Sequence, residues 1–408
     1  MRLKIEKLVY NGYGLGKAEG LVVFVPFTAP EDVVEVEVVE RKRDYAVGVV
    51  KEIVEPSPYR VSPPCENFGR CGGCQWLHIA YEKQIEAKKE ILAWELKKKL
   101  KEIPEIRVVS SPDAHYRRRA LFKVENRFIG FYQFKSKRVI PVGQCLQITE
   151  NMNTALLSLY SFPSILKNAT EIWMGEERKG EQLLVFIRSS RKLKEIHDIF
   201  RDIKDRIDAR LGLRIAYKGK ASTLGIAQIE EEIMGKRLIY GFESFFQANR
   251  YLTEPLAKTV VSAVSEIDSP EVLELFCGAG TFTLPLSEVA KHVWAVERNP
   301  YAVRLLKEAI SLNAVENVSS VREDAESFIK GWERKIDVLI LDPPRTGAKE
   351  VMKEVNRIKP KKLIYISCNP TTLARDLALL DGCKIERLHL FDMFPHTFHI
   401  EAVAEVTL

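Results

Sequence analysis

The sequence lacks any apolar run long enough to cross a membrane, and its first residues lack the charged-then-apolar order of a signal peptide. We therefore expect a cytoplasmic protein without membrane contact. Cysteine is scarce, with seven residues among 408, and three of these lie close together. In a long chain without a secretion signal, clustered cysteines favour a metal site or catalysis over disulfides. No internal repeat or low-complexity segment is present, and the length allows two or three domains.

The sequence also lacks a large excess of one charge. It has 62 Lys and Arg residues and 56 Asp and Glu residues, for a net charge of +6. Such a chain suits a polyanionic partner only where its basic residues cluster. They do so at Tyr116–Phe122, where Arg117, Arg118 and Arg119 adjoin aromatic residues. This pattern favours contacts with phosphates and bases, and a solvated strand edge is the alternative.

Residues 1–57 carry the pattern of a small β-barrel. Leu3–Lys7 and Val34–Val38 alternate apolar and polar residues, which predicts half-buried strands. An all-β segment of this size is typical of an OB-like barrel. The layout resembles a TRAM domain, an RNA-binding module appended to modification enzymes. A barrel that serves only as a structural cap is the alternative.

The clustered cysteines follow the pattern C-x5-C-x2-C at Cys65, Cys71 and Cys74, and Cys145 lies far along the chain. Four thiolates suit either a tetrahedral zinc ion or an iron–sulfur cluster, and the spacing does not decide between them. These cysteines belong to an expected central α+β domain, residues 58–74 and 105–240, which is predicted to bind RNA.

From residue 241 the pattern becomes an alternation of strands and helices, which predicts a Rossmann-like sheet. The first strand, Glu271–Leu275, runs into the Gly-rich stretch Phe276–Thr281. This loop has neither a third glycine in dinucleotide spacing nor the lysine of a P-loop. Acidic residues follow the next three strands, at Glu297, Asp324 and Asp342. A Gly-rich loop followed by these carboxylates fits S-adenosylmethionine better than phosphates.

A reactive cysteine is predicted where the strand Leu363–Ser367 ends. Cys368 follows this strand directly, and Pro370 then opens a helix. The helix dipole would favour the thiolate, which is the reactive form. A small residue that merely packs at a strand end is the alternative. The last apolar run, Phe398–Val406, predicts the closing strand and carries Glu401.

Taken together, these motifs resemble the RNA 5-methyluridine methyltransferase family over essentially the whole chain. The matching stretches are Phe245–Asn249, Leu273–Thr281, Asp342–Arg345, Ser367–Pro370 and Asp392–Glu401. Ala279 stands where Asn is common in the family. The resemblance implies a [4Fe–4S] cluster on Cys65, Cys71, Cys74 and Cys145. It implies S-adenosylmethionine contacts from Gln247, Phe276, Thr281, Glu297, Asp324 and Asp342. It also implies that residues 75–104 pack with residues 241–408 as a class I methyltransferase domain.

The chemistry assigns a role to each candidate catalytic residue. Uracil C5 is too weak a nucleophile to attack a methyl sulfonium unaided, and addition of a thiolate at C6 activates it. Cys368 is therefore the predicted nucleophile, Glu401 the base that removes the C5 proton, and Asp342 a group that orients the ring or the cofactor. Cytosine-C5 enzymes carry a cysteine where Arg345 stands here. A non-catalytic RNA-binding protein with a relict fold is the alternative from another class, and the retention of Cys368 and Glu401 argues against it.

The target base has to leave its stack, so the predicted substrate is a loop or an unfolded stretch of RNA. A charged fraction of 29%, rich in Lys and Glu, is typical of thermophiles and favours an archaeal-type member. For an archaeal member, the family resemblance implies the T-loop uridine of tRNA, position 54, as the target, and for a bacterial member it implies a uridine of large-subunit rRNA, which is the alternative. We expect the protein to be a monomer.

Overall fold

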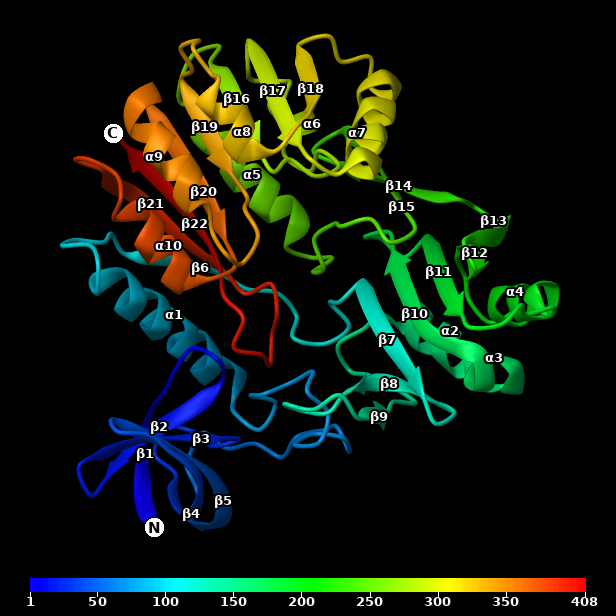
Figure 1. Ribbon diagram of the computed structural model, residues 1–408, viewed down its shortest axis with the longest axis vertical. Coiled ribbons are helices and arrows are strands. Elements are labelled where there is room, and N and C mark those ends of the chain that lie inside the picture. The colour runs from blue at the N-terminus through cyan, green and yellow to red at the C-terminus, as the bar shows by residue number, and fades with distance from the viewer.

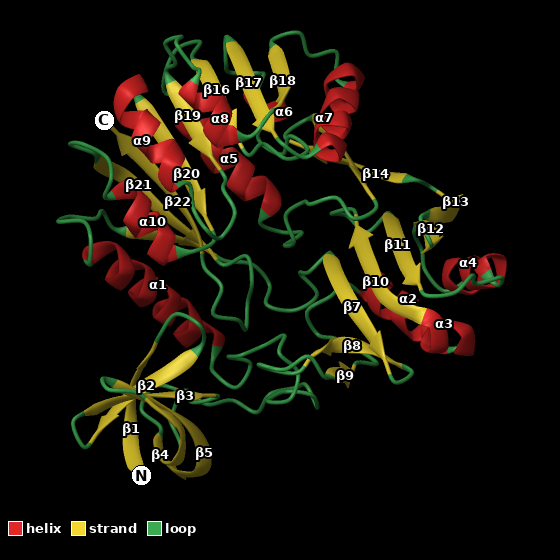
Figure 2. Ribbon diagram, viewed as in Figure 1, coloured by secondary structure: helices red, strands yellow, loops and turns green.

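The computed structural model describes residues 1–408 and contains three main bodies (Figure 1). These are a small closed barrel, a seven-stranded sheet and an eight-stranded sheet, and the two larger sheets carry helices (Figure 2). None of the helices is both long and apolar enough to cross a membrane.

The barrel confirms the predicted N-terminal fold. Its strands are β1 (Arg2–Leu8), β2 (Tyr13–Ala18), β3 (Leu21–Pro26), β4 (Val33–Arg41) and β5 (Tyr45–Glu55), in the closed order β1-β2-β3-β5-β4. The alternation seen in the sequence sends Ile5, Val23 and Val34 into the barrel core, where they are fully buried. Successive side chains of a strand point to opposite faces, so the polar partners face outward.

The central sheet has the strand order β13-β12-β11-β10-β7-β8-β9. Its strands are β7 (Arg119–Glu125), β8 (Phe128–Tyr132), β9 (Val139–Pro141), β10 (Ala169–Glu176), β11 (Gln182–Ser189), β12 (Arg210–Tyr217) and β13 (Lys220–Gly225). Three helices pack on it: α2 (Glu150–Tyr160), α3 (Pro163–Asn168) and α4 (Ile196–Lys204). The shared core includes Leu156, Ile199 and Val185.

The large sheet has the order β18-β17-β16-β19-β20-β22-β21-β6. Its strands are β6 (Ile106–Val109), β16 (Glu271–Leu275), β17 (His292–Glu297), β18 (Val318–Arg322), β19 (Val338–Leu341), β20 (Lys362–Ser367), β21 (Lys384–Phe391) and β22 (Glu401–Thr407). The accompanying helices are α1 (Tyr81–Lys97), α5 (Thr253–Val264), α6 (Thr283–Leu286), α7 (Pro300–Leu312), α8 (Ala325–Lys330), α9 (Lys349–Ile358) and α10 (Pro370–Leu377). The strands from β18 to β20 are parallel, and β22 is antiparallel to both of its neighbours.

One segment that was expected in the central domain lies in the large sheet instead, and a second one packs between the two sheets. Strand β6 pairs in parallel with β21, although the predicted central domain begins at residue 105. The hairpin of β14 (Gln228–Ile233) and β15 (Lys236–Gly241) shares a core with Leu256 of α5. The start of the predicted range 105–240 therefore differs from the observed pairing of β6, whereas the hairpin near its end packs on both sheets. Short strands give little local signal about which sheet they will join, so the sequence could not place them.

Candidate active site

The strand order gathers five predicted site residues at one edge of the large sheet. Because β18, β17, β16, β19 and β20 are adjacent and parallel, their carboxyl ends meet at the same edge. The residues at those ends are Asp324, Glu297, Phe276, Asp342 and Cys368. Strand β22 is antiparallel and starts at this edge, where Ser367 pairs with Ala402. Glu401 is therefore placed beside Cys368.

The Gly-rich loop after β16 has backbone angles that demand glycine. Gly280 has a φ of +94°, and a Cβ there would lie 2.5 Å from Leu306 Cδ1. Gly278 has a φ of +56°, and a Cβ there would meet no atom within 4 Å, so this side of the loop is open. The Gly278 N–H donates to Glu297 Oε2 at 3.2 Å, and the Asn299 N–H donates to Oε1 at 2.7 Å. The Glu297 carboxylate therefore holds the loop against the end of β17.

The other predicted cofactor residues lie within this loop or on neighbouring segments. Thr281 Oγ1 lies 3.3 Å from the Tyr240 hydroxyl. Gln247 is buried, and its main-chain carbonyl accepts a hydrogen bond from Arg118 Nε at 3.0 Å. Asp324 accepts from the first backbone N–H groups of α8 and so caps that helix. An open Gly loop with carboxylates on both sides fits S-adenosylmethionine, whose ribose hydroxyls and amino groups are hydrogen-bond donors.

The environment of the Cys368 thiol differs from the expectation. Burial raises its pKa to about 12, the Glu401 and Asp342 carboxylates add to this effect, and Arg345 opposes it. The predicted gain from the helix dipole is therefore outweighed, because loss of solvent disfavours the charged form. At neutral pH this thiol therefore keeps its proton. The turn itself is fixed locally, since Ser367 Oγ accepts from the Asn369 N–H at 3.2 Å.

Glu401 and Asp342 are neighbouring buried carboxyl groups beside this thiol. Burial raises the pKa of Glu401 well above its usual range, and the neighbouring Asp342 raises it further, whereas Arg345 lowers it. Burial raises the pKa of Asp342 to about 7. Two adjacent carboxyl groups do not ionise together readily, so the pair holds one proton near neutral pH. The site can therefore both accept and donate a proton.

Three further residues contact the site, and two of them, Tyr10 and Glu274, were missed from the sequence. Tyr10 reaches the Cys368 turn from the barrel, and its hydroxyl lies 3.5 Å from the Cys368 carbonyl oxygen. His399 contacts the Arg345 guanidinium at 3.3 Å. Glu274 is buried within β16 and accepts from Thr283 Oγ1 at 2.6 Å, and burial raises its pKa to about 8. An acidic residue inside an apolar strand was a signal for Glu274, but no local pattern marks Tyr10.

The arginine cluster is not the exposed RNA surface that its composition predicts. Arg118 is fully buried and forms a two-pronged ion pair with Glu231, so the predicted contact with RNA is wrong for this residue. Arg119 lies over the ring of Phe245, 4.8 Å from its centroid, and that ring is 61% exposed. A buried arginine has to be paired, and Glu231 lies 113 residues away in sequence, out of reach of any local pattern.

The four clustered cysteines are all free and half-buried. The backbone of Cys71 pairs with that of Gln133 in an isolated antiparallel β-bridge. The Asn153 side chain accepts from the Cys145 N–H and donates to the Cys145 carbonyl oxygen. Burial raises the pKa of Cys71 to about 11, with further contributions from Cys145 and Cys65. The thiols thus lie within electrostatic reach of one another. No group of three or more His, Cys, Asp or Glu side chains is arranged to hold a metal ion, so the metal site remains a prediction.

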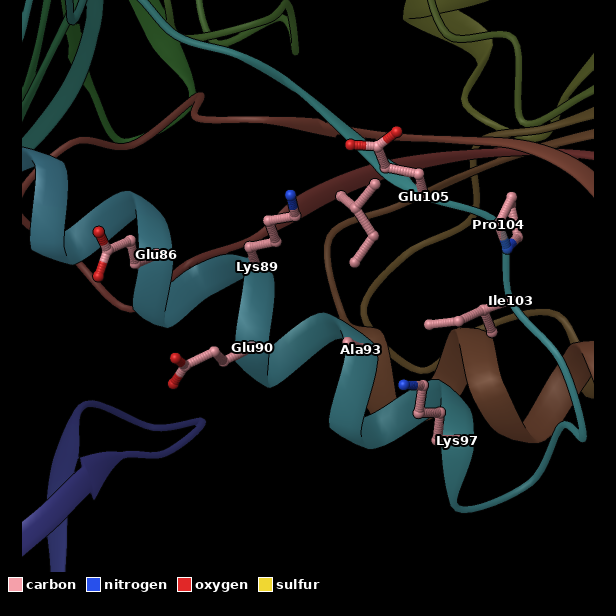
Figure 3. A pocket seen from close by; sticks show the side chains of 9 residues that line it. Glu86, Lys89, Glu90, Ala93, Lys97, Ile103, Pro104 and Glu105 are labelled. Atoms are coloured by element: carbon pink, nitrogen blue, oxygen red, sulfur yellow. The ribbon is translucent and has the colours of Figure 1, made fainter.

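The two other cysteines pack against apolar side chains. Cys277 is buried in a core cluster, and Cys383 packs at the border of another. A separate pocket of about 450 Å³ lies between α1 and the segment 103–106 (Figure 3). It is lined by Glu86, Lys89, Glu90, Ala93, Lys97, Ile103, Pro104, Glu105 and Ile106, and no predicted site residue is among them.

Comparison with known proteins decides the family. Residues 80–406 match the tRNA (uracil-5-)-methyltransferase family, and residues 1–59 match the TRAM domain of tRNA (uracil(54)-C(5))-methyltransferases. The chain belongs to the tRNA (uracil-5-)-methyltransferase family. This RNA (uracil-C5)-methyltransferase uses S-adenosylmethionine, and its N-terminal barrel is a TRAM domain.

Its relatives span nearly the full length. An RNA methyltransferase of Aquifex aeolicus is 34% identical over 99% of this chain and 97% of its own. The 23S rRNA (uracil(1939)-C(5))-methyltransferase of Shewanella amazonensis is 31% identical over 98% of this chain and 94% of its own. The crystal structure of Pyrococcus abyssi tRNA (uracil-54, C5)-methyltransferase with S-adenosyl-L-homocysteine is 26% identical, has a TM-score of 0.80 and covers 100% of both chains.

Proposed function

We propose that Cys368 is the nucleophile of this methyltransferase and that Glu401 is its general base. The observation that carries this proposal is the meeting of Cys368, Glu401 and Asp342 at one sheet edge. The thiol adds to C6 of the target uracil, the S–C6 bond forms, and the C5–C6 π electrons move toward the O4 carbonyl. Because the pKa of the thiol is raised to about 12, its proton has to leave as the bond forms, and the carboxyl pair is the base at hand.

S-adenosylmethionine, when bound, supplies an electrophilic methyl group for C5. Six residues would hold it: Gln247, Phe276, Thr281, Glu297, Asp324 and Asp342. Each Glu297 oxygen already accepts one backbone N–H and keeps a free lone pair for a ribose hydroxyl. After C5 is methylated, one carboxyl proton passes to solvent, and the Glu401 carboxylate freed in this way takes the C5 proton. The electrons of the C5–H bond re-form the C5–C6 double bond, and the sulfur leaves C6 as a thiolate that takes up a proton again.

Substitution of the thiol tests the covalent route. We expect Cys368→Ala to abolish methyl transfer and to leave the affinity for S-adenosylmethionine within a factor of about two, because the thiol acts on uracil. RNA with 5-fluorouridine at the target should give the wild-type enzyme a covalent complex that survives a denaturing gel. Turnover by Cys368→Ala above a few per cent of wild type, or no complex with the fluorinated RNA, would contradict the proposal.

We further propose that the target is uridine 54 of tRNA. Two similarities support it: the match of residues 1–59 to the TRAM domain of enzymes named for that position, and the whole-chain likeness to the Pyrococcus abyssi enzyme. The similarity to a 23S rRNA (uracil(1939)-C(5))-methyltransferase supports the alternative. The decisive experiment offers unmodified tRNA, the same tRNA with U54→C, and a 23S rRNA fragment around position 1939. Methylation of the wild-type tRNA alone is expected, whereas methylation of the rRNA fragment alone would reverse the assignment.

We also propose that Cys65, Cys71, Cys74 and Cys145 bind a [4Fe–4S] cluster. The four thiols are free, half-buried and within electrostatic reach of one another, and they come from two distant segments. This set fits a [4Fe–4S] cluster, in which each thiolate binds a different iron. Anaerobically purified protein should contain iron and sulfide in equal amounts and absorb visible light. Stoichiometric zinc without sulfide, or protein free of both metals, would contradict the cluster.

A further inference from the structure

The barrel makes direct contact with the turn that bears the nucleophile. Residues 9–12 join β1 to β2 in a tight turn, in which the Val9 N–H donates to Tyr13 O at 2.9 Å and the Gly12 N–H donates to Val9 O at 3.1 Å. Asn11 and Gly12 both have positive φ angles. Figure 1 shows this dark-blue turn rising from the barrel toward α1 and the red segment between β21 and β22.

The turn is fitted closely to the catalytic domain. A Cβ on Gly12 would lie 3.0 Å from Phe398 Cδ1 and 3.1 Å from Gln75 Cγ, so only glycine fits without displacement. Trp76, which is fully buried, donates its indole N–H to the Gly12 carbonyl at 3.2 Å. The turn is therefore anchored, and its side chains have defined positions.

Tyr10 is the residue of this turn that reaches the active site. Its ring meets the ring of Phe398 edge-on, with centroids 5.6 Å apart. Its hydroxyl donates to the carbonyl oxygen of Cys368 at 3.5 Å, and Arg345 and Glu401 lie within electrostatic reach of it. Burial raises the pKa of Tyr10 to about 12, so the hydroxyl keeps its proton and remains a donor at any working pH.

We infer that Tyr10 is a positioning residue for the nucleophile, and that docking of the TRAM barrel completes the active site by fixing the Cys368 backbone. The inference rests on the proposed role of Cys368. A turn between a strand and a helix sets the direction of its side chain, and small displacements of a reacting group lower the rate steeply. The barrel thus acts on the chemical step as well as on affinity for RNA.

The test compares Tyr10→Phe with wild type in single-turnover reactions on 5-fluorouridine RNA. Phenylalanine keeps the packing on Phe398 and removes only the hydroxyl. The rate of adduct formation at saturating RNA should fall roughly threefold to tenfold, the factor expected for one lost hydrogen bond. The KM for RNA and the affinity for S-adenosylmethionine should stay unchanged, and Tyr10→Ala, which also loses the ring packing, should be slower still.

Tyr13→Phe is the matched control, because the buried hydroxyl of Tyr13 has no hydrogen-bond partner and its ring packs against Phe24 and Phe134. Its adduct rate should equal that of wild type. A wild-type rate in Tyr10→Phe would overturn the inference, as would a raised KM for RNA with an unchanged rate at saturation. If wild type itself forms no adduct, the proposed role of Cys368 fails instead, so the two failures are distinguishable.

Discussion

Single residues of the active site owe their properties to burial. The thiol of Cys368 and the carboxyls of Asp342 and Glu401 lose solvent together, and each charge disfavours the next, while Arg345 partly compensates. The predicted helix dipole is a smaller effect, worth about 0.3–1 kcal/mol at an ordinary site. The proposed reaction therefore depends on proton transfer between neighbouring groups and not on a thiolate that exists in advance.

A pH dependence of the covalent step follows from this arrangement. The carboxyl with a pKa of about 7, Asp342, is protonated below that pH and cannot accept the thiol proton, so the rate of adduct formation should rise as pH increases through about 7. Single-turnover rates on 5-fluorouridine RNA between pH 5.5 and 8.5, with saturating cofactor, measure it. Asp342→Asn should be slower and should lose the rise near pH 7. A wild-type rate that is flat over this range would show that the pair does not take the proton.

The second residue-scale prediction concerns Glu401. Glu401→Gln keeps the size of the side chain but cannot take the C5 proton, so release of the thiol should become slow. A covalent protein–RNA complex that carries the methyl group should accumulate on ordinary, unfluorinated RNA. Denaturing gels with methyl-labelled cofactor would reveal the label in the slow-migrating complex. Normal turnover by this variant would assign the base to another group, with His399 the next to test.

At the scale of elements, one buried ion pair docks α1 onto the catalytic domain. Lys88 and Asp392 are both fully buried, with 2.5 Å between Nζ and Oδ1, and the Tyr81 hydroxyl donates to the other oxygen of Asp392 at 2.8 Å. Gln84, one turn away from Lys88, accepts from the His396 N–H at 2.9 Å. The helix is therefore fixed to the segment that leads into β22 and Glu401.

Loss of one partner of this pair should be costly. Lys88→Met leaves Asp392 buried without its cation, and we expect about 3–5 kcal/mol less free energy of unfolding in urea. Lys89→Met, at the exposed neighbouring position of the same helix, is the control and should change it by less than about 0.5 kcal/mol. The double variant Lys88→Met with Asp392→Asn should recover part of the loss. Equal stability of Lys88→Met and Lys89→Met would show that the pair does not hold the helix.

At the scale of the whole molecule, each body contributes to one site. The large sheet carries the proposed reacting groups, the barrel reaches the Cys368 turn through Tyr10, and Arg118 beside the central sheet donates to the Gln247 carbonyl. The same Arg118 pairs with Glu231 in the hairpin that packs on α5. The relative positions of the three bodies therefore determine the shape of the cofactor site.

Arg118→Met tests this link between domains. The variant removes the hydrogen bond to the Gln247 carbonyl and leaves Glu231 buried without a partner, so both stability and affinity for S-adenosylmethionine should fall. Calorimetric titration of the cofactor should give a dissociation constant raised roughly tenfold, the effect of about 1.4 kcal/mol. Arg188→Met, at an exposed arginine of the same sheet, is the control. An unchanged dissociation constant in Arg118→Met would show that this contact of the central domain does not contribute to cofactor binding.

Local sequence patterns were enough to predict the barrel, the parallel strands and the order of residues along the sheet edge. Alternation with period two indicates which face of a strand is buried. The carboxyl ends of adjacent parallel strands share one edge of the sheet, so the sequence alone predicts that Glu297, Asp342 and Cys368 lie near one another. Their motifs also determined the family.

Only the tertiary structure decided what surrounds these residues. The contact of Tyr10 with Cys368 spans 358 positions, and that of Arg118 with Glu231 spans 113. Strand β6 joins the large sheet through four residues that carry no signal for a partner. The sequence predicted a lowered pKa for Cys368, but the pKa is raised because the folded chain buries the thiol. The burial of a group depends on all the residues that pack around it. Local sequence patterns encode the elements, but burial and long-range contacts arise only when the elements assemble.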